Sequence, residues 1–505
     1  MGILELRELG TTALLKYVTV LCISYYVFSS IVAWYKLRHF AGSFLCKFSH
    51  IWSIYHQYVK DVGPAHLKLS KYNYPLVRTG PHYLVTTDPN IFKHVNGARS
   101  TYQRDPLWAA GRVDYYRPSL ADTLDVASHD KKKAKVAGGY SGARSTWRES
   151  STGKSPISLT RFFTLDVITR LSYGKEFGWV KADEDLYGYG SEISKAAVMG
   201  AFVSDVTWLH PFVRWSFFNR RLKPDPTASH GVGRFAEDKK DDRDMIGSFM
   251  RHGLAMDEIA DEALIQIFVR SDTTAIVIRS VMLHLIATPR VCTFHNSPST
   301  LAMLHTTMVA LTPEGRDQVC GLQRQSINPN YFGASTILAL SPGTLDFPPF
   351  PGPYHASAAA PAVIWEGFRM RPAVTYGHYK VVPPGGDTIA GMWVPGGTAI
   401  GHCHYGMMRN KQIFGDDVEV FRPERYLDEP NGEGMQRTVE LVFGTGRWMC
   451  VGKQVALMEL NKIFWELLRQ FNFQLVNPGQ AGWKETSSVT FTHSDMWIKI
   501  MEAEH

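Results

Sequence analysis

Apolar residues recur with helical spacing over several long stretches of this chain. One stripe comprises positions 162, 163, 165, 167, 168 and 171, and another comprises positions 455, 458, 460, 463, 464, 467, 468 and 471. Such spacing is typical of the buried face of an amphipathic helix. Residues 257–287 form a third helical candidate, roughly 45 Å long if straight, which ends before Pro289. The pattern therefore predicts a mainly helical body.

Shorter apolar runs predict a small β part. Residues 74–77 and 83–86 flank Gly80-Pro81 and indicate a hairpin. Residues 379–400 predict short strands separated by turns rich in proline and glycine. Residues 365–371 indicate the end of another helix, which is closed by a proline at 372. The expected fold class is mainly α with a small β part.

Residues 291–360 match neither pattern. Only five of these seventy residues are charged, and six prolines lie between positions 342 and 361. A structureless stretch of this length is unusual inside a compact domain. We predict an atypical insertion that is loop-like or poorly ordered, with an error in the gene model as the alternative.

One N-terminal segment has the length and polarity of a membrane span. Residues 17–35 carry no formal charge and extend roughly 29 Å as a helix, about the thickness of a hydrocarbon core. Lys36 and Arg38 follow at once, so the positive-inside rule places the body in the cytosol. A signal peptide fits poorly, because such a peptide has a basic start, a shorter apolar run and a small-residue cleavage site, which this segment does not match. A buried core helix is the other alternative. We expect an N-terminal segment 1–16, a single-pass transmembrane anchor 17–35 and a body 36–505.

Composition narrows the class of protein further. With 505 residues, 45% hydrophobic and 20% charged, the chain has the make-up of a globular protein. A net charge of +7 is mild for this length and does not indicate a nucleic-acid partner. The six cysteines lack paired spacing, which argues against a disulfide scaffold and suits a reducing compartment. His402-Cys403-His404 is a weak zinc candidate, since adjacent residues of a strand point to opposite faces.

A glycine-rich loop precedes the last amphipathic helix and contains one cysteine. Gly444 and Gly446 allow a tight turn before Cys450, and Gly452 leads into the helix near Lys453. A thiolate near a helix N-terminus gains from the helix dipole, so we expect a lowered pKa for Cys450 and a capacity to bind a metal. The alternative from spacing alone is a buried, inert cysteine.

Four ordered motifs resemble those of the cytochromes P-450. The loop reads Phe443-Gly-x-Gly-x-x-x-Cys450-x-Gly452, preceded in family order by Ser271-Asp272-Thr273-Thr274, Glu366-Gly-Phe-Arg369 and Phe421-Arg-Pro-Glu-Arg425-Tyr426. The similarity covers about residues 36–290 and 362–500 and extends to fungal members of the pisatin-demethylase-like type. It implies a cytochrome P-450 fold preceded by one transmembrane helix, with residues 36–505 as the haem domain.

The resemblance implies haem b as the cofactor and assigns residues to it. Cys450 becomes the axial thiolate ligand of the haem iron, with Phe443, Gly446 and Arg447 in the same cofactor-binding loop. His129 and Lys133 resemble the helix whose basic residues bind the haem propionates; a solvated lysine run at 131–135 is the alternative. Many family members have a basic residue two positions before the cysteine, where this chain has a tryptophan.

Further roles are carried over in the same way. Asp272 and Thr273 resemble the acid–alcohol pair that relays protons above the haem, although an ordinary polar helix face is the alternative. Glu366, Arg369 and Arg425 resemble a buried structural network supporting the loop, as opposed to a surface ion pair. The family has small residues, alanine and glycine, where this chain has Val269 and Arg270, so the arginine must turn away from the pocket or occupy it.

The function implied is that of a monooxygenase that inserts one oxygen atom from O2 into a lipophilic substrate, in fungal secondary metabolism. No dinucleotide fingerprint is present, so electrons would come from NADPH through a separate flavoprotein reductase. The expected location is the endoplasmic reticulum membrane. The alternatives are a catalytically impaired or non-catalytic relative, indicated by the arginine at 270, a shortened stretch at 142–150 and the region 291–360, or a haem-thiolate isomerase or dehydratase.

Overall fold

The computed structural model describes residues 3–70, 74–111, 117–141, 156–182, 184–186, 244–287, 359–427, 429–476 and 483–502. The shortened stretch predicted at 142–150 lies outside these residues. The insertion predicted at 291–360 also lies outside them, except for its last two residues, which begin a helix.

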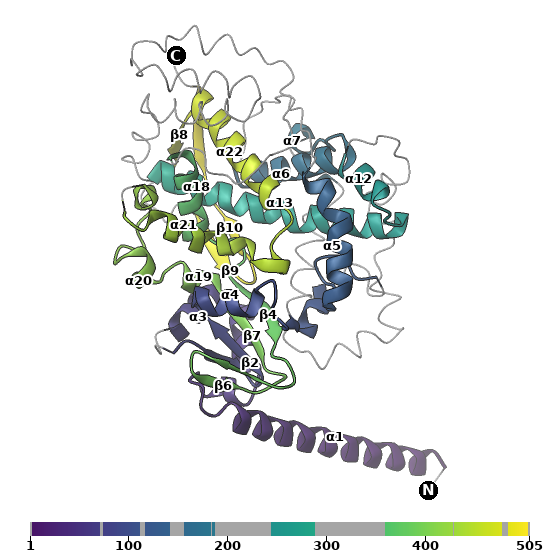
Figure 1. Ribbon diagram of the computed structural model, residues 1–505. Helices are drawn as coiled ribbons and strands as arrows, with labels where there is room; N and C mark the ends of the chain where they lie inside the picture. The colour runs from purple at the N-terminus through teal and green to yellow at the C-terminus, as the bar shows by residue number, and fades with distance from the viewer. Residues whose placement is uncertain are drawn as a thin grey trace, which may run out of the picture.

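Helices make up most of the described chain (Figure 1). The α-helices are α1 (Ile3–Lys36), α2 (Ile51–Val59), α3 (Val62–Ser70), α4 (Pro89–Asn96), α5 (Val126–Ser141), α6 (Pro156–Tyr173), α7 (Trp179–Ala182), α12 (Met245–Arg251), α13 (Met256–Ala287), α18 (Ala359–Met370), α19 (His404–Met407), α20 (Lys411–Phe414), α21 (Gly432–Val439) and α22 (Lys453–Gln470). Short 3-10 turns include η1 (Leu45–Lys47), η6 (Pro423–Tyr426), η7 (Glu440–Phe443) and η8 (Gly446–Trp448). The apolar stripes therefore mark α6 and α22, and the long helix appears as α13.

The main sheet lies at the end of the body from which α1 leaves, whereas the strand of residues 471–475 lies near the opposite end (Figure 1). The strands are β1 (Val77–Gly80), β2 (Tyr83–Thr86), β3 (Gln103–Arg104), β4 (Tyr376–Val381), β5 (Asp387–Ile389), β6 (Met392–Val394), β7 (Ala399–Cys403), β8 (Phe471–Leu475), β9 (Lys484–Ser487), β10 (Phe491–Ser494) and β11 (Ile498–Glu502). The main sheet has the order β1-β2-β7-β4-β3, with β2 and β7 parallel and the other pairs antiparallel. The predicted hairpin is β1–β2, and its first strand begins later than expected.

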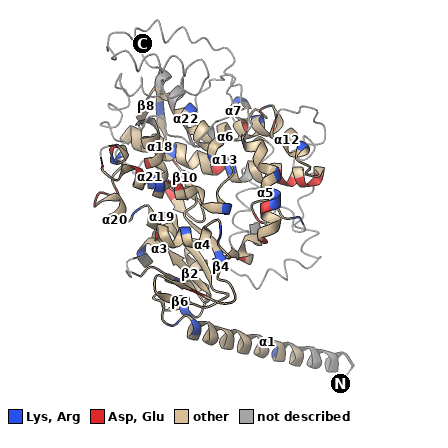
Figure 2. Ribbon diagram, viewed as in Figure 1, with Lys and Arg blue, Asp and Glu red and all other residues tan. Residues whose placement is uncertain are grey.

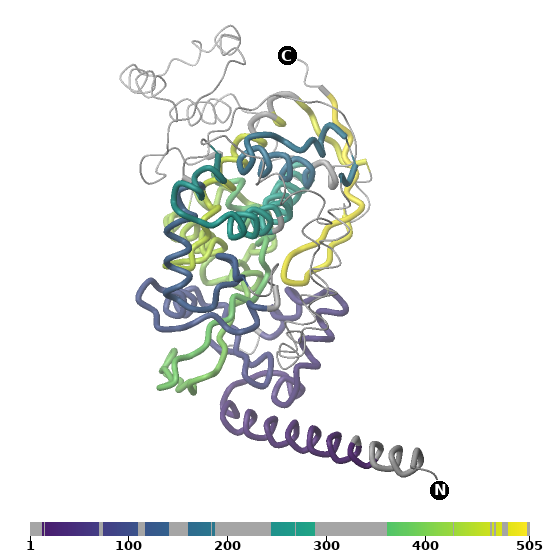
Figure 3. Tube along the Cα trace, turned by 90° about the vertical axis from the view of Figure 1, so that its right-hand side faces the viewer, coloured from purple at the N-terminus to yellow at the C-terminus, as the bar shows by residue number. Residues whose placement is uncertain are grey.

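Helix α1 extends away from the body in both views (Figures 1 and 3). Its segment Lys16–Lys36 has a mean hydropathy of 1.6 and is long and apolar enough to cross a membrane. Figure 2 shows basic residues where the helix joins the body, at Lys36 and beyond, whereas Lys16 lies at the other end of the apolar segment. There the Ser30 hydroxyl donates a hydrogen bond to the Phe48 carbonyl at 2.9 Å. The last turns of α1 are thus fixed to the body.

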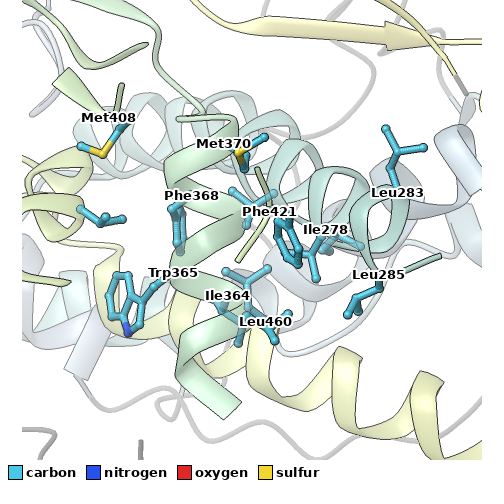
Figure 4. Close-up of a cluster of buried hydrophobic side chains, with 14 of the residues drawn as sticks. Ile278, Leu283, Leu285, Ile364, Trp365, Phe368, Met370, Met408, Phe421 and Leu460 are labelled. Atoms are coloured by element: carbon cyan, nitrogen blue, oxygen red, sulfur yellow. The ribbon is translucent and has the colours of Figure 1, made fainter. Parts of the chain in front are cut away.

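A buried apolar cluster joins α13, α18 and α22. Ile278 from α13, Ile364 and Phe368 from α18, and Leu460 from α22 all lie in it (Figure 4). Gly367 allows this close approach, because a Cβ at this position would collide with the Val281 side chain of α13. A second cluster packs α5, α6 and α12 against the first half of α13. These two clusters hold in place the helices that carry the site.

Candidate functional site

The cysteine loop is a sharply turned segment between η7 and α22. The Cys450 amide donates to the Phe443 carbonyl at 2.7 Å, which closes the loop on itself. Gly444 and Gly446 have φ angles of +76° and +60°, where a side chain would be strained. A Cβ on Gly446 would also lie 2.6 Å from the Asn96 carbonyl oxygen at the end of α4. The loop therefore packs against the end of α4, and the Cys450 side chain is exposed at the start of α22.

The electrostatics of Cys450 differ from the expectation for a helix N-terminus. Desolvation by the surrounding protein raises the pKa of the thiol, although its surface is exposed. The backbone N–H of Gly452, the Arg270 guanidinium and the Lys133 ammonium act in the opposite direction and do not overcome it. The prediction of a lowered pKa is wrong for the protein alone. A bound metal cation supplies the charge that deprotonates such a thiol outright.

Beside the loop, two basic side chains and one histidine ring contact the Trp448 ring. The Lys380 Nζ lies 3.3 Å from the ring centroid, the Arg104 Cζ lies 4.5 Å from it, and the His129 ring centroid is 4.3 Å away. Lys380 is only 1% exposed. Burial, together with repulsion from Arg104 and Arg447, holds the pKa of Lys380 well below its usual range. This region favours a negatively charged ligand.

Unpartnered donors point to the same conclusion. Among the described residues, the buried Arg104 Nε and Trp448 Nε1 have no hydrogen-bond partner. Buried donors of this kind are normally satisfied, so they indicate a group that accepts hydrogen bonds. The carboxylates of the haem propionates have the required charge and acceptor oxygens. The sequence did not indicate Arg104, whereas Lys380 could have been noticed as a lysine within an apolar strand.

Both predicted basic residues of α5 lie against the cysteine loop. Lys133 Nζ donates to the carbonyl oxygens of Arg447 at 2.7 Å and Met449 at 2.8 Å. The His129 ring packs against Trp448, and burial lowers the pKa of this histidine to about 4. Arg447 turns outward, donating to the Ala98 carbonyl at 2.7 Å with Asp130 3.4 Å away. The α5 residues thus position the loop directly.

On α13, Asp272 and Thr273 are adjacent in sequence but contact different groups. The Thr273 hydroxyl donates to the Val269 carbonyl at 2.9 Å, and Val269 is 46% exposed. These two residues, four apart, therefore share one open face of the helix. The Asp272 carboxylate lies 3.2 Å from Arg161 Nε on α6, and 36% of its side chain is exposed. Asp272 is thus held by an ion pair with access to solvent.

Arg270 reaches from α13 to α22. Its Nη2 lies 2.9 Å from Glu459 Oε2 on α22, and both side chains are buried. The guanidinium therefore bridges α13 to the helix that follows the cysteine loop.

The three residues of the predicted network meet at one carboxylate. Arg369 donates from Nε and Nη2 to the two Glu366 oxygens, each at 2.8 Å, and Arg425 Nε donates to Oε1 at 3.1 Å. All three side chains are fully buried. The next residue of α18 before Arg369, Phe368, packs edge-on against the Phe443 ring with centroids 5.0 Å apart. The network therefore supports the loop through α18.

The histidines near the sheet form a separate buried group. The rings of His402 and His404 lie 4.2 Å apart, and His378 Nδ1 is 3.2 Å from His402 Nε2. Cys403 accepts a hydrogen bond from the Gly406 amide at 3.2 Å. Within the described parts of the chain, no group of three or more histidine, cysteine or acidic side chains has a geometry that could hold a metal ion.

Comparison with known proteins identifies the family. The family model described as cytochrome P450 matches residues 359–495, which include the Glu366 network and the cysteine loop. A cytochrome P450 monooxygenase called aba1, from Botryotinia fuckeliana (strain B05.10), is 35% identical over 92% of this chain and 91% of its own length. The chain belongs to the cytochrome P450 family. The predicted family and fold class are thereby confirmed, and the family implies a haem-iron cofactor.

Other relatives of this P450 are also fungal. The cytochrome P450 monooxygenase ABA1 of Pyricularia oryzae (strain 70-15 / ATCC MYA-4617 / FGSC 8958) is 34% identical over 94% of both chains. Pisatin demethylase of Fusarium vanettenii is 24% identical over 94% of this chain and 92% of its own. The predicted likeness to pisatin demethylase is therefore present, at lower identity than the likeness to the aba1 proteins. Together these relatives support an oxidoreductase of the monooxygenase type.

Proposed function

We propose that this P450 is a haem-thiolate monooxygenase that inserts one oxygen atom from O2 into a lipophilic organic substrate. One observation carries the proposal: an exposed Cys450 sulfur lies at the start of α22. Beside it, Arg104 and Lys380 contact Trp448, and the buried donors Arg104 Nε and Trp448 Nε1 have no hydrogen-bond partner among the described residues. A thiolate for iron and cations for propionates are the two requirements of haem b. The helix α13 adds an open face with a hydroxyl group, and it meets α22 through the Arg270–Glu459 pair.

The residues of the chain divide into those that hold the cofactor and those that support them. Cys450 binds the iron, and Phe443 lies across the loop from it. Arg104 and Lys380, together with His129 of α5, bind the propionates, while Lys133 holds the loop carbonyls in place. When bound, haem supplies the activation of dioxygen, and a thiolate ligand favours cleavage of the O–O bond.

In this proposal, Asp272 and Thr273 transfer protons from solvent to the site. The Asp272 carboxylate, balanced by Arg161, takes protons from solvent, which its half-exposed position permits. The Thr273 hydroxyl, held by the Val269 carbonyl, delivers them on the open face of α13. Val269 and Thr273 also shape the space for an apolar substrate. The Arg270 guanidinium is engaged by Glu459 of α22, and Val269 is 46% exposed.

The setting of the reaction follows from the anchor and from the relatives. The segment 17–35 holds the haem domain, 36–505, on the cytosolic side of the endoplasmic reticulum membrane. An NADPH-dependent flavoprotein reductase supplies electrons there. The substrate is a lipophilic small molecule of fungal secondary metabolism, since similar proteins are fungal monooxygenases.

A carbon monoxide difference spectrum tests the proposal. The full-length protein is expressed with haem supply, reduced with dithionite and exposed to carbon monoxide. A strongly red-shifted Soret band is expected, and Cys450→Ser should abolish it. Cys22→Ser, at an exposed position in the anchor, is the matched control and should leave the band intact. An unchanged spectrum in Cys450→Ser would falsify the assignment of the iron ligand, and turnover without O2 or reductase would contradict oxygen insertion.

A further inference from the structure

The cysteine loop lacks the basic residue that many cytochromes P450 have two positions before the cysteine. Trp448 stands at that position, at the end of η8. The neighbouring Arg447 does not replace it, because its Nη2 donates to the Ala98 carbonyl at 2.7 Å and its Nη1 lies 3.4 Å from Asp130. The positive charge that a haem carboxylate requires must therefore come from outside the loop.

Lys380 of β4 brings such a charge to the Trp448 ring. Its Nζ lies 3.3 Å from the ring centroid, and Lys380 is only 1% exposed. An ammonium over the face of an indole is attracted by the quadrupole of the ring. The charged side chains that act on the pKa of Lys380, Arg104 and Arg447, are both positive, and no described carboxylate opposes them. An unpaired buried cation is costly, so this place favours the binding of an anion.

The indole of Trp448 adds a hydrogen-bond donor to this cation. Its Nε1 is buried and has no hydrogen-bond partner among the described residues. Arg104 Nε is in the same state, and the Arg104 Cζ lies 4.5 Å from the centroid of the Trp448 ring. The Nη1 of Arg104 is already occupied, since it donates to the carbonyls of Leu120 and Thr123, both at 2.9 Å. Unused N–H donors therefore lie on the ring and beside it, next to the cation of β4.

We propose that Trp448 and Lys380 act together in place of the missing basic residue: the ring holds the ammonium, and the indole N–H and the ammonium both bind the haem carboxylates. The inference rests on the proposed function, because it requires haem as the ligand. It adds a role for Trp448 and makes each residue depend on the other. A carboxylate accepts hydrogen bonds from both donors, and its negative charge favours the charged form of the lysine.

The test measures the rate of haem loss from the full-length, haem-loaded protein to excess apomyoglobin, followed by the change in the Soret band. Lys380→Met should accelerate haem loss about tenfold, because a hydrogen bond between charged groups is lost. Trp448→Phe retains a ring and loses the N–H, so an acceleration of about threefold is expected. Lys499→Met, at an exposed position of β11, and Trp393→Phe, at an exposed position of β6, are the matched controls and should not change the rate.

Moving the charge back into the loop separates this arrangement from the usual one. Trp448→Arg restores a basic residue to the loop, but it removes the ring and places a second cation beside Lys380, so haem loss should become about tenfold faster. In the double variant Lys380→Met/Trp448→Arg the arginine has no cation next to it, and haem loss should return to within about threefold of wild type. Slower haem loss in Trp448→Arg alone, or additive effects of the two substitutions, would overturn the inference.

The remaining outcomes are also decisive. If Trp448→Arg fails to fold, Lys380→Met and Trp448→Phe decide, because wild-type rates of haem loss in both variants contradict the arrangement. A wild-type protein that takes up no haem refutes the proposed function as well. A normal carbon monoxide band, with rates of haem loss that respond to none of these substitutions, refutes this inference alone.

Discussion

At the scale of single residues, the Glu366 carboxylate has the clearest structural role. Besides the two arginines, it accepts hydrogen bonds from the Tyr426 hydroxyl at 3.0 Å and the Arg422 amide at 2.9 Å. A buried carboxylate with this many donors is fully compensated, and the donors depend on it in turn. The sequence predicted the partners of Glu366 through the family motifs. Only the structure showed that one carboxylate joins α18 to η6.

Removing Glu366 should therefore be costly. Glu366→Ala leaves the buried guanidinium groups of Arg369 and Arg425 without a counter-charge, and we expect a loss of about 3–5 kcal/mol in the free energy of unfolding. Urea unfolding followed by circular dichroism measures this loss. Glu433→Ala, which removes the exposed partner of Arg437, is the control and should have little effect. Equal effects of the two substitutions would contradict a buried network.

Glu262 makes stability depend on pH. Its side chain is 2% exposed, accepts a hydrogen bond from the Leu120 amide at 2.6 Å and lies 3.6 Å from Lys132 Nζ. Burial raises the pKa of Glu262 from 4.5 to about 7. The folded state then binds the proton more tightly than the unfolded state, so stability falls as pH rises through this interval.

Glu262→Gln should remove this fall in stability with rising pH. The glutamine stays neutral, so the free energy of unfolding should decline less between about pH 5 and pH 8, by up to about 3 kcal/mol. Denaturant unfolding across this range provides the measurement. Glu258→Gln on the same helix is the matched control, since Glu258 lies 3.7 Å from the same lysine but is 36% exposed. The expectation fails if both variants show the same pH dependence as wild type.

At the scale of elements, the cysteine loop is positioned by helices from distant parts of the chain. The end of α4 underlies Gly446, Lys133 of α5 binds the loop carbonyls, and Phe368 of α18 packs against Phe443. The loop motif could be predicted from the sequence, because its turn requires backbone angles that only glycine adopts without strain. The packing of the loop on α4 could not be predicted, because nothing in the sequence of α4 relates it to residues 350 positions later.

Gly446→Ala should displace the loop and reduce haem binding. An added Cβ meets the backbone of Asn96, Gly97 and Ala98 at 2.6–2.8 Å, and backbone cannot move aside easily. We expect at least a fivefold loss of haem content in the purified protein. Gly391→Ala is the matched control, because Gly391 has a φ of +77° but its Cβ position is open. It should cost only about 1–2 kcal/mol of backbone strain and retain haem. Normal haem content in Gly446→Ala would show that the loop tolerates the shift.

At the scale of the whole molecule, a long apolar helix projects from a body that contains the site (Figure 1). The last turns of α1 are tied to this body, where Ala33 is fully buried and the Ser30 hydroxyl binds the Phe48 carbonyl. Exposed apolar side chains, among them Phe44 and Tyr58, lie just beyond the helix. The end of the body that carries the main sheet is thus the end nearest the apolar helix (Figure 1).

Deleting residues 3–28 should release the protein from membranes while preserving the site. The deletion ends before Ser30, so the contacts of α1 with the body remain. Full-length protein should resist extraction by alkaline carbonate, because a spanning helix is inserted in the hydrocarbon core, and the shortened protein should be extracted. The shortened protein should still give the carbon monoxide band. Carbonate resistance after the deletion would show that the body itself inserts.

The sequence by itself determined the family, through its motifs, as well as the helical fold class, the long apolar N-terminal helix and the position of the glycine-rich cysteine loop. These depend on local spacing, apolar periodicity and glycine positions, which neighbouring residues along the chain define. Tertiary structure alone decided that Arg104 and Lys380 meet at Trp448, that Arg270 pairs with Glu459, and that burial raises the pKa of Cys450. Distant segments come into contact, and charged or titratable groups lose water, only when the chain packs. Patterns along the sequence therefore do not predict these contacts or pKa shifts.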